Sequence, residues 1–138
     1  MYRLYKVGIS YFALFSVLLL MTGLVMFYLK TGVSLEGTLE YYRVKSYDGL
    51  LELSYPHLGG MGIFIMVLGH FFLFTSLRYK ARWWFITMFV AALSSLMAPL
   101  FIVVFKSAFF TWIKLLSVVI LVMLGVGFSL RLFKESVL

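Results

Sequence analysis

The chain has 138 residues and a formal net charge of +7, and 64% of its residues are hydrophobic while only 12% are charged. A soluble domain carries about 25% charged residues, so this chain could not cover a globular surface with polar groups, and lipid must solvate much of it. Cysteine is absent, which excludes disulfides, thiolate metal sites and covalent c-type haem attachment. Nucleic-acid binding is disfavoured too, because no soluble basic domain is present to carry the positive charge.

Four long apolar stretches predict membrane helices, at about residues 7–29, 56–77, 83–105 and 108–130. Each is long enough, since a membrane helix needs about 20 apolar residues. The first is too long for a signal-peptide core and no small-residue cleavage site follows it, so we interpret it as a retained helix. The connections after the second and third helices are short and favour antiparallel neighbours. We therefore predict an all-α fold, a four-helix antiparallel transmembrane bundle forming one membrane domain over residues 1–138.

The loop between the first two membrane helices, residues 31–54, has a pattern of its own. Leu35, Leu39 and Tyr42 share one helical face, and Ser34 is a plausible N-cap, so we expect a short amphipathic helix on the outer membrane surface. Asp48–Gly49 is typical of a turn. Pro56 suits the first turn of the second membrane helix, where its missing N–H has no cost.

Charge predicts the orientation of the chain in the membrane. Seven basic residues and one acid, Glu135, flank the helices on the side of the chain ends; the basic residues are Arg3, Lys6, Arg78, Lys80, Arg82, Arg131 and Lys134. The other side carries bases and acids in similar numbers. The positive-inside rule then predicts a multi-pass integral membrane protein with both termini in the cytoplasm.

The third and fourth helices each contain one unusual residue. Pro99 lacks an N–H and therefore leaves the carbonyl of Ser95 without its helical partner, which we expect Ser94 or Ser95 to compensate. Lys114 lies near the start of the fourth helix, and we expect its side chain to extend outward to the interface. The predicted helices contain no Asp or Glu in their interior, which argues against proton-coupled export.

Two histidines in the second helix, His57 and His70, are the candidates for chemistry, because an ionisable group inside a bilayer span is costly. They lie about 140° apart around a helix and about 20 Å apart along it, so one metal ion cannot bind both. His57 is either an interfacial histidine hydrogen-bonded to the outer loop, or a ligand of an outer haem or of a metal. His70 is either hydrogen-bonded within a helix contact or an axial haem ligand.

His70 shares a strip of its helix with Gly59, Gly62 and Gly69, and glycine lets another helix or a flat macrocycle approach the backbone. No third histidine is present to act as a second axial ligand. Met88 and Met123 lie at a similar depth, and a methionine thioether can fill that position. The candidate cofactor is therefore haem b, with His70 and His57 as the candidate metal ligands.

The stretch from Gly49 to His70 resembles helices of small membrane b-type cytochromes, which carry two histidines about four turns apart with glycines between them. The spacing here is thirteen residues where fourteen would keep both rings on one face, and no second helix supplies facing histidines. A homodimer, or a larger complex with a cytochrome partner, could supply the missing ligands, so we expect a homo-oligomer or a subunit of a membrane complex.

We therefore expect a membrane electron-transfer subunit that carries haem b and passes electrons between quinol and an extracytoplasmic partner. Two alternatives stay open. One is a non-catalytic subunit that anchors or assembles a larger membrane complex, with structural histidines. The other is a metal-dependent membrane enzyme that uses His57 and the outer acidic residues.

Overall fold

A computed structural model describes residues 2–73 and 81–137, with side chains for residues 6–73 and 82–136. All the secondary structure in these ranges is helical: α1 Tyr2–Thr31, α2 Leu35–Arg43, α3 Tyr47–Phe72, α4 Ala81–Phe105 and α5 Ala108–Val137. The four long helices are apolar enough to cross a membrane, whereas α2 is short. The predicted all-α, four-helix transmembrane fold is therefore confirmed.

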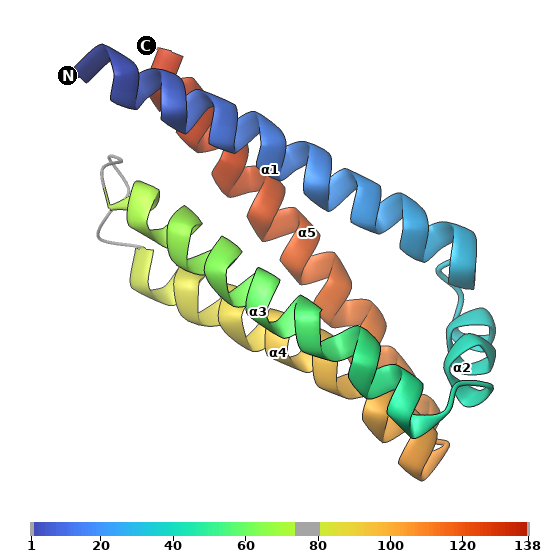
Figure 1. Ribbon diagram of the computed structural model, residues 1–138. Helices are drawn as coiled ribbons and strands as arrows, with labels where there is room; N and C mark the ends of the chain where they lie inside the picture. Colours follow the sequence, from blue (N-terminus) through green and yellow to red (C-terminus); the bar gives the residue numbers. More distant parts are fainter. Residues whose placement is uncertain (1, 74–80, 138) are drawn as a thin grey trace.

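The long helices pack in the spatial order α1, α5, α4, α3, so α5 runs between α1 and the α3–α4 pair (Figure 1). The antiparallel pairs expected from the short connections, α3 with α4 and α4 with α5, are both present. Ring contacts join the outer members of the row, since the Phe12 ring of α1 lies with its centroid 5.1 Å from that of Phe71 and 6.3 Å from that of Phe64. Side chains of α1 and α3 therefore meet, although the backbones of these two helices do not pack closely against each other.

The core is centred on α4, whose buried residues include several small ones. Ala91, Ala92 and Ala98 are each at most 5% exposed, and Met88 and Ile102 are buried beside them. Small residues let helix backbones approach closely in a membrane, where the gain comes from packing rather than from removing apolar surface from water. The large apolar side chains that remain exposed on the long helices are the surface that lipid solvates.

The helix α2 closes one end of the bundle, and the N and C ends of the chain lie together at the opposite end (Figure 1). The Ser34 hydroxyl accepts a hydrogen bond from the Gly37 N–H at 3.0 Å, which confirms the predicted N-cap. However, α2 packs against α1, α4 and α5, and the residue that it buries completely is Thr38. It therefore covers the helix ends, whereas we expected its apolar face to lie on the membrane surface.

The helix α3 begins at Tyr47, nine residues before the predicted start. The Ser46 hydroxyl accepts from the Gly49 N–H at 3.1 Å and caps the helix, and Asp48 in the first turn complements the helix dipole. The expected turn at Asp48–Gly49 and the placement of Pro56 in the first turn are therefore wrong, because Pro56 lies inside the helix. The predicted end of this helix at residue 77 lies outside the described residues.

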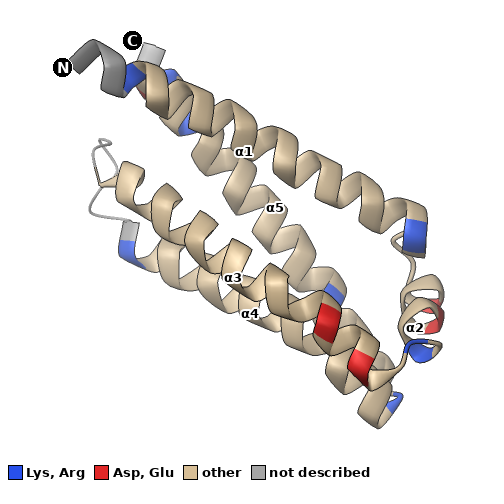
Figure 2. Cartoon of the chain, viewed as in Figure 1, with Lys and Arg blue, Asp and Glu red and all other residues tan. Residues whose placement is uncertain are grey.

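Charged residues gather at the two ends of the bundle and leave its middle apolar (Figure 2). The end with the chain termini carries mainly basic residues, whereas the end with α2 carries both signs. This is the asymmetry on which the orientation rests. The arrangement makes the protein a multi-pass membrane protein, and the cytoplasmic position of its termini stays a prediction.

Candidate functional site

A cavity of about 610 Å³ lies between α3 and α4, near the end of the bundle with the chain termini. We refer to it as the α3–α4 cavity. Its walls come from α3, α4 and one residue of α5, and they are mostly apolar: Ile65, Met66, Leu68, Gly69, Phe72, Leu73, Phe85, Ile86, Met88 and Phe128. Its volume falls within the range of about 300–1,000 Å³ that is usual for ligand pockets.

Two cationic or titratable side chains also line this cavity. His70 belongs to the last turn of α3, and Arg82 belongs to the first turn of α4, because the two helices are antiparallel and their adjoining ends meet. Both residues are exposed at the protein surface. Met88 lies about 9 Å further along α4 than Arg82 at 1.5 Å per residue and is only 2% exposed. The cavity thus has a polar mouth and an apolar, sulfur-bearing wall.

Gly69 lies at a helix contact, one of the two roles that the sequence left open for it. A Cβ atom at this position would collide with the ring of Phe85, so the missing side chain makes room for an aromatic residue of α4. Gly59 and Gly62 have no neighbouring atoms where a Cβ would lie, and neither lines the cavity. The strip of glycines is therefore a helix-packing feature at Gly69 and an open surface elsewhere.

His57 and Met123 lie away from the cavity. His57 is exposed on α3, and its Nδ1 lies 2.8 Å from the Leu53 carbonyl of the same helix. Met123 is 70% exposed on α5. Of the sequence-predicted site residues, the structure brings together His70, Met88 and Gly69. The described residues contain no group of three or more His, Asp or Glu that could hold a metal ion, so the outer metal-dependent site has no support.

A second polar site, which the sequence interpretation missed, surrounds Lys114 on α5. This lysine is 9% exposed, and its Nζ donates to the Ser95 carbonyl at 2.7 Å and to the Ser95 hydroxyl at 2.9 Å. The expectation that it extends outward to the interface is therefore wrong. The reason is that an acceptor lies close by on α4, so that the ammonium is hydrogen-bonded without reaching water.

The acceptor exists because of Pro99. A proline four residues after Ser95 cannot donate to its carbonyl, and that carbonyl is buried with the rest of Ser95, which is 4% exposed. The lysine from the neighbouring helix donates in place of the missing N–H, so the expected compensation by Ser94 or Ser95 is wrong. Ser95 lies ten residues before the end of α4 and Lys114 six residues after the start of α5. In an antiparallel pair this leaves about 6 Å along the helix axis, which a lysine side chain spans, and this spacing is the signal that could have paired them.

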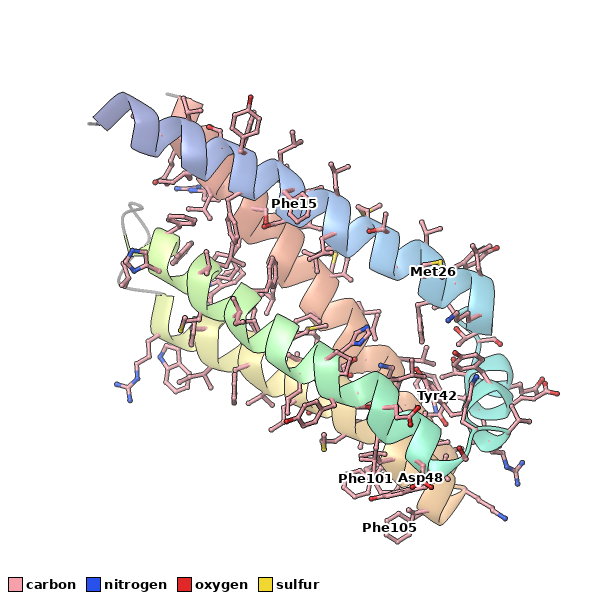
Figure 3. The ribbon with its side chains drawn as sticks, viewed as in Figure 1. Phe15, Met26, Tyr42, Asp48, Phe101 and Phe105 are labelled. Atoms are coloured by element: carbon pink, nitrogen blue, oxygen red, sulfur yellow. The ribbon has the colours of Figure 1, made fainter. Side chains whose placement is uncertain are left out.

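Aromatic residues cover the Lys114 ammonium. The ring centroids of Phe27 and Tyr42 lie 5.8 and 5.9 Å from Nζ. Tyr42 lies where α2 meets the bundle (Figure 3). Burial, with a smaller contribution from the nearby Tyr41, raises the pKa of the Tyr42 phenol above its ordinary value. The α2 helix therefore holds an uncharged tyrosine against a buried lysine.

Comparison with known proteins identifies a family for this chain. Residues 27–137 match the sequence model of a protein family described as a transmembrane helical domain. No curated protein and no solved structure matches the chain. The matched segment runs from the end of α1 to the end of α5 and so contains both the α3–α4 cavity and the Lys114 site.

Proposed function

We propose that this chain, which belongs to the family of transmembrane helical domains matched above, is a membrane electron-transfer subunit that binds one haem b in the α3–α4 cavity. One observation carries the proposal: His70 and Met88 come from different helices, and both line the same cavity. Histidine and methionine are a known axial pair for haem iron. The sequence suggested that the glycines of α3 leave room for the porphyrin. In the structure that room is instead provided by the volume of the α3–α4 cavity.

The chain's own residues fit a haem in three respects. The His70 imidazole supplies a nitrogen ligand, and the Met88 thioether a soft second one. The Arg82 guanidinium, at the mouth, suits the carboxylates that a haem carries, since arginine binds carboxylates through paired hydrogen bonds. The apolar walls exclude water and so stabilise a neutral or weakly charged group. A haem bound there would supply one-electron transfer.

The position of the cavity limits how many haems bind and what they exchange electrons with. His57 lies about 20 Å from His70 along α3 and outside the cavity, so the proposal is for one haem. The far end of α3, at Tyr47, lies about 35 Å from His70 by the same rise per residue. A direct exchange with a partner at that end is therefore disfavoured. Because His70 is exposed on a helix that is apolar enough to cross a membrane, quinol in the bilayer is the proposed electron donor.

Haem titration tests this proposal. Purified protein in lipid nanodiscs should bind haem with a stoichiometry of one, and His70→Ala should weaken binding at least ten-fold. His57→Ala is the matched control, because it removes the other imidazole of the same helix and should leave binding unchanged. Met88→Leu should lower the midpoint potential, whereas Met123→Leu should not. Equal effects of the two histidine variants would contradict the proposal.

A second candidate, a non-catalytic assembly subunit, is favoured by the outer half of α3. Residues 51–53 and 55–60 are all exposed, and they include Glu52 and His57. Polar side chains exposed on a membrane helix gain from a partner that covers them. This candidate predicts a colourless protein that co-purifies in fixed ratio with another membrane protein or a second copy, and substitution of Glu52 and His57 together should break that association.

A further inference from the structure

The Lys114 site has more hydrogen-bond donors than acceptors. An ammonium has three N–H groups, and two of them are used on Ser95. The rings of Phe27 and Tyr42 cover Nζ at almost 6 Å, the outer limit of a cation–π contact. Among the described residues no further hydrogen bond leaves Nζ. One donor of a buried ammonium is therefore available to a ligand.

The positive charge of Lys114 also has no partner. Within the described chain no carboxylate lies within salt-bridge distance of Nζ, and the described acids of α2, Glu36 and Glu40, are exposed at the surface. A buried charge without a counter-charge is strongly unfavourable, because it has lost its hydration and gained no opposite charge in return. A small anion would restore that balance.

Two buried threonines supply the independent observation. Thr38 of α2 and Thr111 of α5 are 0% exposed, and the hydroxyl oxygen of each lacks a hydrogen-bond partner. The other threonines with described side chains, Thr22, Thr31 and Thr87, all donate to the carbonyl four residues earlier in their own helix. Thr38 and Thr111 do not make this hydrogen bond, so their hydroxyls remain available as donors.

The two threonines lie on the helix faces that carry Lys114 and Tyr42. Thr111 precedes Lys114 by three residues, which places it about 60° away on the same face of α5. Thr38 precedes Tyr42 by four residues, about 40° away on the same face of α2. Since both threonines are buried, α2 packs directly on α5 and Tyr42 contacts Lys114, we place both hydroxyls on the Lys114 side of this interface.

We propose that a small monovalent anion of the size of chloride binds in this layer, against the Lys114 ammonium and beneath α2, with the Thr111 and Thr38 hydroxyls as further donors. The anion accepts the third N–H of Lys114 and neutralises its charge. This site lies at the opposite end of the bundle from the α3–α4 cavity, so it is independent of the haem proposal.

An anion titration tests the proposal. Thermal unfolding of the protein in nanodiscs is followed as sodium chloride replaces sodium gluconate at fixed sodium concentration. The unfolding temperature of the wild type should rise with chloride and saturate, because a ligand that binds only the folded state stabilises it. Lys114→Met should abolish that rise, while Lys106→Met, which removes an exposed lysine at the same end, should keep it. A rise of equal size in wild type and Lys114→Met would overturn the proposal.

Two further measurements keep the test decisive if Lys114→Met fails to fold. Thr111→Val removes one neutral donor and should raise the half-saturating chloride concentration about five-fold. In crystals grown with sodium bromide, the anomalous map should show one bromide within hydrogen-bond distance of Nζ. A water at that position, or an unchanged chloride dependence in both Thr111→Val and Thr38→Val, would contradict an anion site.

Discussion

The ammonium of Lys114 on α5 donates to the carbonyl of Ser95 on α4 at 2.7 Å, and that carbonyl is the one that Pro99 leaves without a helical donor. A lysine of one membrane helix thus completes the hydrogen bonding of its neighbour. Lipid offers no donor for a freed carbonyl, so this contact ties together two features that would each be unfavourable alone.

A double-mutant cycle at these positions should show the coupling. Lys114→Met leaves the Ser95 carbonyl without its donor and should cost about 1–3 kcal/mol of unfolding free energy. Pro99→Ala restores an N–H, so the same lysine substitution in that background should cost at least about 1 kcal/mol less. Reversible unfolding in mixed detergent micelles measures both. Additive effects, within about 0.3–0.5 kcal/mol, would show that the two residues act independently.

Gly69 should be the intolerant glycine of α3. A Cβ there meets the Phe85 ring, so Gly69→Ala should destabilise the protein by about 1–3 kcal/mol through overpacking. Gly62→Ala is the matched control, because open space surrounds its Cβ position and alanine favours a helix by up to about 1 kcal/mol. The same unfolding assay compares them. If Gly69→Ala proved as stable as Gly62→Ala, the close α3–α4 contact at Phe85 would be wrong.

Much of the fold follows from single-helix properties, and these were predictable. The third predicted membrane helix, 83–105, agrees with α4 at Ala81–Phe105, because charges and a short turn bound an uninterrupted apolar stretch. The Ser34 cap was predictable because it is also a local feature, which depends on two residues three apart in the sequence. The early start of α3 was missed because Pro56 offered a competing helix start, while the cap at Ser46 carries only a short local signal.

The features that were missed depend on two helices at once. On a single helix in lipid, the long side chain of Lys114 is expected to reach the interface, and its acceptor on α4 enters only when the two helices pack. Met88 and Met123 were equivalent by depth, but α4 and α5 are apolar around most of their circumference. The rotation of α4 and α5 about their own helix axes therefore cannot be predicted from a polar–apolar pattern. Only packing separates the buried Met88 from the exposed Met123.

Alkaline pH should destabilise the packing of α2 on the bundle. Burial raises the folded-state pKa of Tyr42, so its contribution to stability is complete below the unfolded pKa of about 10 and is lost as the pH rises further. Chemical unfolding between pH 8 and 11 should thus show a steeper loss for the wild type than for Tyr42→Phe. Tyr55→Phe is the control, because Tyr55 is 83% exposed and should leave the wild-type slope unchanged. Parallel curves for wild type and Tyr42→Phe would contradict the burial of this phenol.

The orientation can be measured directly, since the chain has no cysteine. Single cysteines at Val44, in the connection after α2, and at Lys134, near the end of α5, should react with a membrane-impermeant reagent from opposite sides. The charge distribution predicts that Val44→Cys reacts from outside the cell and Lys134→Cys only after lysis. The reverse labelling pattern would show that the orientation predicted from the charges is wrong.

Haem binding in the α3–α4 cavity is tested by the reduced-minus-oxidised absorption spectrum. The protein should be purified gently from membranes, with its native partners and with ample haem during expression. We expect one b-type α-band in the wild type and in His57→Ala, and its loss in His70→Ala. A colourless wild-type protein, or a spectrum that His70→Ala leaves intact, would contradict haem binding in this cavity.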